Sequence, residues 1–190
     1  MPTPVLHVIV GPNGAGKSTF HRSVLAPSTL EFVNADNIAA RLWPGEEEER
    51  SYDAARLAEE RRTDLLSERR SFVAETVFSH ESKVDLLRRA SEAGYVVVLH
   101  VIMISEALAV ERVAHRVANG GHSVPEDKIR SRHRRLWSHV AQAAGIADET
   151  VVYDNSSASS PFKIVTTYRS GKLARPPTWP PWAPAELVNL

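Results

Sequence analysis

One stretch constrains the fold of this chain more than any other: Gly11-Pro12-Asn13-Gly14-Ala15-Gly16-Lys17-Ser18-Thr19. It matches the pattern G-x-x-x-x-G-K-[ST] at every fixed position, and it directly follows an apolar run at residues 5–10. Glycine allows backbone conformations in which successive N–H groups point into one concavity and hold phosphate oxygens. The stretch therefore predicts a buried strand, a phosphate-binding loop (P-loop) and a helix that begins at Lys17.

The residue types of the loop predict what it binds. Lys17 is expected to reach the β- and γ-phosphates of ATP, and Ser18 is expected to ligate Mg²⁺. A glycine-rich hairpin is the alternative, but the strand before the loop and the helix after it favour a nucleotide site. The predicted nucleotide-binding residues of the loop are Gly11, Pro12, Asn13, Gly14, Ala15, Gly16, Lys17, Ser18 and Thr19.

Strand and helix patterns alternate along the rest of the chain. Strands are predicted at 31–34, 71–75, 95–102, 150–153 and 162–168, and helices at 17–26, 38–70 with an interruption at 43–45, 80–93, 105–119 and from 124 onward. This alternation predicts an α/β, three-layer P-loop NTPase fold with a mostly parallel five- or six-stranded sheet and a helical lid.

We expect one kinase-like domain at residues 1–174, with the lid at about 105–135. Residues 175–190 are rich in proline and tryptophan, which predicts an extended tail whose Trp179 and Trp182 pack back onto the domain.

Composition limits the class of partner. The chain has 23 Lys and Arg residues and 23 Asp and Glu residues, and this zero formal net charge argues against a general nucleic-acid binder. The absence of cysteine excludes disulfides, thiolate metal sites and a cysteine nucleophile. No apolar run approaches the roughly 18 residues of a membrane span, and there is no signal-peptide pattern, so we expect no membrane partner and a cytoplasmic location. The four acids at 46–49 are interpreted as a solvated helix turn rather than a metal site.

Polar residues follow two predicted strands. Asp36 comes after the second strand, and Glu75 and Thr76 end the third. Right-handed crossovers place the ends of the first three strands along one rim, so Lys17, Asp36 and Glu75 are expected to converge. Asp36 is predicted either to accept the proton of an acceptor hydroxyl or to cap the helix that begins there. Glu75 or Thr76 is predicted to bind the acceptor or a magnesium-bound water.

Arginines on both sides of Gly120-Gly121 suit a lid that closes over a transferring phosphate. The alternative for each of them is a solvated helix face. The candidates are Arg112, Arg116, Arg130 and Arg132.

Other P-loop classes fit less well. No Asn-Lys-x-Asp or Thr-Lys-x-Asp guanine motif is present, and the strong strand at 95–102 ends in Met103-Ile104-Ser105 rather than in the acid of a mechanical ATPase. These patterns favour phosphoryl transfer to an acceptor.

An ordered set of motifs resembles the zeta-toxin family of small P-loop kinases. The motifs are residues 11–19, Asn34-Ala35-Asp36, Ala74-Glu75-Thr76, residues 112–125 and Tyr153-Asp154-Asn155-Ser156, and the resemblance covers roughly residues 5–168. Members of that family use ATP to phosphorylate a sugar hydroxyl of UDP-N-acetylglucosamine and related nucleotide sugars, and some are toxins held by an antitoxin. The resemblance thus implies a small-molecule kinase with a possible antitoxin partner.

The resemblance also assigns roles to single residues. Lys17 and Ser18 match the nucleotide and magnesium residues, Asp36 matches the base on the sugar hydroxyl, and Glu75 and Thr76 match the acceptor-contacting pair. The phosphate-stabilising arginines match Arg116 and Arg132, with Arg130 or Arg135 as alternatives for the second. Asn155 matches a loop near the adenine, where a simple turn is the alternative, and His122 matches a lid-hinge contact or a catalytic residue.

The chain departs from the better-known toxins because it is short, lacks an extra substrate-binding insertion and has a compact lid. The leading hypothesis is therefore a kinase for a nucleotide sugar or a related small acceptor. A kinase of nucleic-acid ends, and an ATP-binding toxin–antitoxin component without small-molecule kinase activity, are the alternatives.

Overall fold

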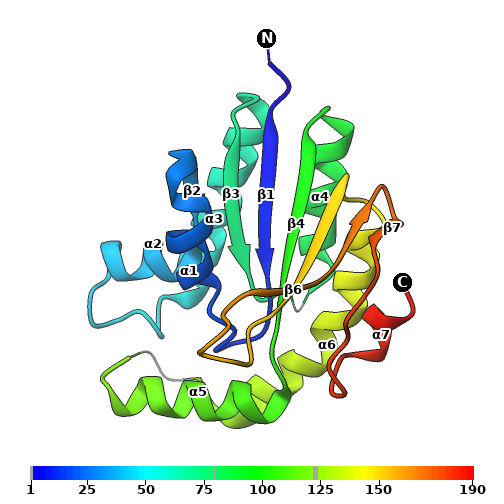
Figure 1. The fold of residues 1–190 in the computed structure, drawn as a ribbon. Coiled ribbons are helices and arrows are strands. Elements are labelled where there is room, and N and C mark those ends of the chain that lie inside the picture. The colour runs from blue at the N-terminus through cyan, green and yellow to red at the C-terminus, as the bar shows by residue number, and fades with distance from the viewer. Residues whose placement is uncertain (1, 79, 122–123) are drawn as a thin grey trace.

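One sheet of seven strands forms the centre of the molecule (Figure 1). The computed structural model describes residues 2–78, 80–121 and 124–190. The strand order is β2-β3-β1-β4-β5-β6-β7; the first five strands are parallel, and β6 and β7 are antiparallel. The strands are β1 (Val5–Val10), β2 (Glu31–Val33), β3 (Phe72–Thr76), β4 (Val96–Met103), β5 (Glu149–Asp154), β6 (Lys163–Arg169) and β7 (Lys172–Arg175).

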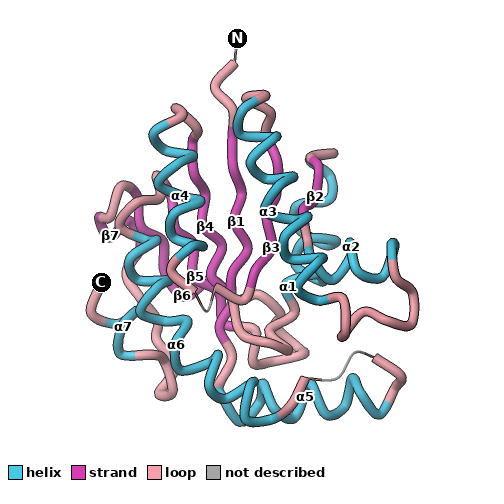
Figure 2. Tube along the Cα trace, turned by 180° about the vertical axis from the view of Figure 1, so that it is seen from behind, coloured by secondary structure: helices cyan, strands magenta, loops and turns pink. Residues whose placement is uncertain are grey.

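Helices lie on both faces of this sheet, which makes three layers. They are α1 (Lys17–Phe20), α2 (Ala35–Leu42), α3 (Ser51–Ser67), α4 (Ser82–Glu92), α5 (Glu106–Ala118), α6 (Glu126–Ala144) and α7 (Ala185–Val188), with a π-helical turn η1 (His21–Leu25) and a 3-10 turn η2 (Ala26–Ser28) after α1. Figure 2 shows α3, α4 and α6 in front of the sheet, and α5 across its lower end. Within the described ranges, no helix has an apolar stretch of the length that a bilayer requires.

The sheet separates two buried clusters of apolar side chains. The larger one lies under α3, α4 and α6, and includes Leu6 of β1, Leu99 of β4 and Trp137 of α6. The smaller one lies on the other face and includes Ile9 and Phe20. The nearly continuous apolar runs of β1 and β4 follow from this arrangement, because the central strands of a parallel sheet are buried on both faces.

The predicted fold class is confirmed, but two details of the C-terminal part were wrong. The sheet has seven strands rather than five or six, because Lys172–Arg175 form an additional hairpin strand whose side chains are all exposed and so carry no apolar pattern. The tail is not extended throughout, since residues 185–188 form a short helix whose Leu187 is fully buried. Trp179 and Trp182 do pack against the larger cluster.

A chain of polar side chains crosses the sheet just above the P-loop. His7 Nδ1 on β1 and His100 Nε2 on β4 are joined by a hydrogen bond of 3.1 Å, and His100 Nδ1 lies 3.4 Å from the Tyr153 hydroxyl on β5. Phe20 packs against the rings of both His100 and Tyr153. Burial lowers the pKa of His100 to about 3, and His7 adds a smaller lowering, so the buried ring is neutral at neutral pH.

This burial predicts acid sensitivity of the fold. The unfolded chain binds a proton at residue 100 near pH 6.5 and the folded chain does so only near pH 3, so the free energy of unfolding should fall as the pH drops through this interval. The loss for one histidine is about 1.4 kcal/mol per pH unit well below pH 6.5. Urea denaturation at pH 7 and at pH 5 measures it. His100→Gln should flatten the dependence and the exposed control His115→Gln should not; equal slopes for wild type and His100→Gln would contradict the assignment.

Candidate active site

The P-loop joins the end of β1 to α1 at the carboxyl edge of the sheet (Figure 1). Its lysine is folded back over the loop: Lys17 Nζ donates hydrogen bonds to the carbonyl oxygens of Gly11 at 3.0 Å and Pro12 at 3.1 Å. Ala15 N donates to Pro12 O at 3.2 Å, which closes the turn. Pro12, Ala15 and Lys17 are buried, Asn13 and Ser18 are half-buried, and Thr19 is exposed.

Two glycines of the loop lie where a side chain would collide. Gly11 has a φ of +157°, and a Cβ atom there would overlap the carbonyl oxygen of Ile102 on β4. Gly16 has a φ of +87°, and a Cβ atom there would lie 2.7 Å from Asn155 Nδ2. In the same loop, Asn13 Oδ1 is buried and has no hydrogen-bond partner among the described residues. Open backbone and an unpaired polar atom are what a loop that receives a phosphate ligand needs, so the residues present fit a nucleotide.

Asn155 fixes the loop from the side of β5. Its side chain is buried; Nδ2 donates to Ala15 O at 2.8 Å, and Oδ1 accepts a hydrogen bond from Phe162 N at 3.2 Å. One side chain therefore ties the P-loop to the segment between β5 and β6. A contact with an adenine base stays a prediction, and the bracing role was missed because it depends on residues 140 positions apart.

Ser18 and Glu75 form a hydroxyl–carboxylate pair at the start of α1. Ser18 Oγ donates to Glu75 Oε2 at 3.0 Å, and Glu75 is 9% exposed. β3 runs beside β1 with Ile9 opposite Glu75, and this pairing brings the carboxylate to the loop. Oxygen ligands of this kind suit Mg²⁺. Thr76, the next residue, uses its hydroxyl to accept a hydrogen bond from Phe78 N at 3.2 Å.

The ammonium group of Lys17 is the electrostatic centre of the site. Burial lowers its pKa, the negative charges of Glu75 and Asp36 raise it, and the positive charges of Arg116 and Arg132 lower it. The four charged residues predicted from the sequence thus all lie within electrostatic range of one buried cation. Their sequence positions span almost a hundred residues, so the fold is what brings them together.

The carboxylate of Asp36 does not cap α2, and that alternative is therefore wrong. Asn34 is the cap: its side-chain oxygen accepts a hydrogen bond from Asn37 N at 2.9 Å. Asp36 lies in the first helical turn and is exposed. Its carboxylate is consequently available to a ligand.

Asp36 lines a cleft of about 340 Å³ between α2, the start of α3 and α5. Glu47 and Arg116 also line it, so the cleft carries two acids and one arginine among small side chains. The full lining is Ala35, Asp36, Asn37, Ala39, Ala40, Glu47, Ser51, Ala54 and Arg116. Sequence reasoning missed Glu47, because the acidic run at 46–49 resembles an ordinary solvated turn. Another cavity, of about 400 Å³ between α5 and α6, is lined mainly by valine, alanine and isoleucine and offers little to phosphate chemistry.

The arginines separate into different environments. Arg130 is engaged by Glu106 at 2.9 Å and Glu126 at 2.8 Å. Arg135 Nε donates to Ser131 O of its own helix. Arg112 Nη1 lies 3.5 Å from Gly14 O and so contacts the P-loop. Arg116 and Arg132 are the two whose charges act on Lys17, while His122 lies outside the described residues.

Known protein families and solved structures share the fold described above. The family model described as an AAA domain matches residues 6–139, which is more than half of the chain. The chain belongs to this AAA domain family. Its fold is the three-layer P-loop NTPase fold, and no curated protein sequence matches it.

Several solved structures share the fold. A chain of the AvrRxo1-ORF1:AvrRxo1-ORF2 complex, solved with ATP, has a TM-score of 0.71 and 16% identity over 91% of this chain. This chain spans 60% of the length of that protein. A chain of the PezAT chromosomal toxin–antitoxin system of Streptococcus pneumoniae has a TM-score of 0.61 and 15% identity, covering 88% of this chain and 72% of its own. A chain of the Pnkp1/Rnl/Hen1 RNA repair complex has a TM-score of 0.57 and 21% identity. The match covers 90% of this chain and 50% of the chain in that complex.

The bracing contact of Asn155 makes a prediction about both stability and binding. Asn155→Ala leaves Ala15 O and Phe162 N without partners, which should cost about 2 kcal/mol in the free energy of unfolding and weaken ATP binding. Urea denaturation and calorimetric titration with ATP measure the two effects. The exposed Asn189→Ala is the matched control. If Asn155→Ala had the same free energy of unfolding and the same affinity for ATP as Asn189→Ala, Asn155 would not brace the loop.

Proposed function

We propose that the chain is an ATP- and Mg²⁺-dependent kinase that transfers the γ-phosphate of ATP to a hydroxyl group of a small acceptor. The observation that carries the proposal is the surroundings of Lys17, where a buried P-loop ammonium is under the influence of Asp36, Glu75, Arg116 and Arg132. Phosphoryl transfer needs this combination of a phosphate cradle, an acid near the acceptor and positive charge over the moving group.

The P-loop side of the site would bind the phosphates of ATP and Mg²⁺. Lys17 and the backbone N–H groups of the loop would hold the phosphates of ATP, and Ser18 would hold Mg²⁺, with Glu75 positioning the Ser18 hydroxyl. Bound Mg²⁺ neutralises charge on the β- and γ-phosphates. Holding the phosphates still and in a low-dielectric site is the main contribution of these residues.

The cleft beside α2 is the part of the site that would bind the acceptor. The carboxylate of Asp36 lines it and accepts the proton of the acceptor hydroxyl. Arg116, on the same cleft, and Arg132 stabilise negative charge on the transferring phosphoryl group. Helix α5 and the first part of α6 would then form the lid at about 105–135 and exclude water when substrate is bound, while the rest of α6 stays packed under the sheet.

A nucleotide sugar or a related polyol is the acceptor that we favour. The two acids and the amide side chain of Asn37 in the cleft suit sugar hydroxyls, and the motif resemblance to the zeta-toxin family supports the same class. The likeness in fold to a chain of a toxin–antitoxin system is consistent with an antitoxin partner.

The role of Asp36 is testable by substitution. Asp36→Asn keeps the size of the side chain and removes the base, so kcat should fall by about 100-fold or more. Phosphate transfer from labelled ATP to a panel of UDP-sugars, sugars and RNA or DNA ends measures it. Asp64→Asn, on an exposed part of α3, is the control. Full turnover by Asp36→Asn would exclude the proposed base, and transfer confined to nucleic-acid ends would favour the alternative kinase.

Substitution of Glu75, at the end of β3, distinguishes a role in positioning Mg²⁺ from a role in binding the acceptor. If Glu75 positions the metal through Ser18, Glu75→Gln should raise the Mg²⁺ concentration for half-maximal activity by about 10-fold with little change in acceptor KM. Initial rates measured over a grid of Mg²⁺ and acceptor concentrations distinguish the effects. A raised acceptor KM with unchanged Mg²⁺ dependence would instead make Glu75 an acceptor-binding residue.

A further inference from the structure

The two faces of the sheet are covered unequally. Helices α3, α4 and α6 cover one face, as Figure 2 shows from behind. On the other face, α1 and η1 lie over β2, β3 and the loop end of the sheet, where Phe20 covers His100 of β4 and Tyr153 of β5. Figure 1 shows no helix across the opposite ends of β1, β4 and β5. A sheet of this kind normally has helices on both faces, so the bare area needs an explanation.

Strand register identifies the side chains on this bare area, because residues opposite each other point to the same face. One row across the sheet is His7, Val98, Glu149, Arg169 and Lys172. The next row toward the P-loop contains Val151, Thr167 and Arg175, and the row before the first pairs Val5 with Val96.

Several apolar side chains of this area are open to solvent, beside the half-buried His7 and Thr167. Val96 is 39% exposed and Ile164, opposite Tyr153, is 36% exposed. Val98 is partly exposed, and Val151 is partly exposed at the edge of the smaller buried cluster, against which it packs. Val96 and Val98 belong to neither buried cluster of the described residues. We call Val96, Val98, Val151 and Ile164 the open face.

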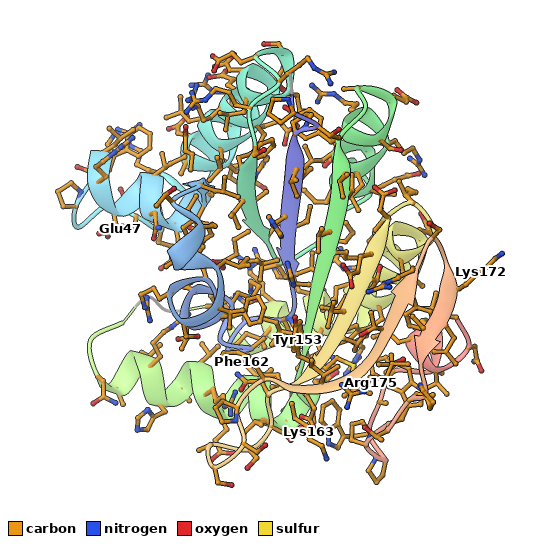
Figure 3. All side chains as sticks on the ribbon, turned by 45° about the horizontal axis from the view of Figure 1, so that its top comes forward. Glu47, Tyr153, Phe162, Lys163, Lys172 and Arg175 are labelled. Atoms are coloured by element: carbon orange, nitrogen blue, oxygen red, sulfur yellow. The ribbon has the colours of Figure 1, made fainter. Side chains whose placement is uncertain are left out.

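A basic rim borders the open face on one side. Arg169, Lys172 and Arg175 are all exposed and belong to β6 and β7, and Figure 3 shows Lys172 and Arg175 at this edge of the sheet. Glu149 is the acid in the same rows, 3.9 Å from Arg169. The rim therefore has an excess of positive charge, although the whole chain has none.

We propose that the open face docks a protein segment that presents apolar side chains together with acidic ones. The valines and Ile164 would be buried by the apolar side, and the acids would pair with the rim. Nucleic acid fits less well, since its phosphates gain nothing from a valine surface. A second copy of this chain would bring an identical basic rim, and like charges disfavour that pairing.

The test uses the whole protein and an unbiased probe. A displayed library of random 16-residue peptides is selected against the wild-type chain, and the enriched peptides are synthesised with a fluorophore. The expected sequences combine apolar residues with Asp or Glu. Their affinity, measured by fluorescence anisotropy, should fall at least 10-fold for Val96→Glu and for the double variant Lys172→Glu/Arg175→Glu.

Matched variants control for exposure and charge. Val188→Glu, at a valine 44% exposed on α7, and Arg56→Glu, at an exposed arginine on α3, should bind the peptides within twofold of wild type. Thermal melting confirms that each variant is folded, and phosphate transfer should be unchanged, so this test is independent of the proposed kinase activity.

Four results would overturn the proposal. The enriched peptides could lack an acidic bias or bind the open-face variants as tightly as wild type. A labelled 20-nucleotide RNA or DNA could bind in a manner lost in the same variants, which would assign the face to nucleic acid. Sedimentation could show a dimer that Val96→Glu dissociates, which would assign the face to a second copy.

Discussion

The site depends on keeping one ammonium group charged inside the protein. Burial disfavours the charged form of Lys17, and the structure compensates with two carbonyl oxygens at hydrogen-bond distance and the negative charges of Glu75 and Asp36. A buried charge without such partners would cost several kcal/mol. The acids proposed to act on the acceptor and the metal therefore also balance the lysine.

The strand order places these groups. Because β3 lies between β2 and β1, the residues after β2, at the end of β3 and after β1 are neighbours along one edge. Asp36, Glu75 and Lys17 are those residues. On the opposite side of β1, β4 and β5 supply the backbone against which the loop packs and the Asn155 side chain that braces it. Along this edge, the residues proposed to act on the acceptor lie on the β2–β3 side of the P-loop, and Asn155, which braces the loop, lies on the β5 side.

Sequence patterns predicted the parts of this arrangement that depend on local chemistry. The P-loop motif, the apolar central strands and the polar strand ends were all recognisable, since each is a property of neighbouring residues. The sequence offered Asp36 as a helix cap, whereas Asn34 is the cap, because α2 begins at residue 35 and leaves Asp36 inside its first turn. Strand β7 carries only exposed side chains, and Glu47 reaches the cleft only through the packing of α2 against α3. The arginines of α5 and α6 were separable only once their partners, such as Glu106 for Arg130, were visible.

The contacts of Asn155 bear on the order in which parts of the site are synthesised and folded. The P-loop is encoded in the first twenty residues, but β1 pairs with strands that begin at residues 72 and 96, and the brace comes from residues 155 and 162. Contacts between residues so distant in sequence form late in folding, because long loops must close first. The nucleotide-binding loop is thus the earliest part of the site to be synthesised and among the last to acquire its shape. A nascent chain that carries only the motif and its first helix does not yet have the loop held by Asn155.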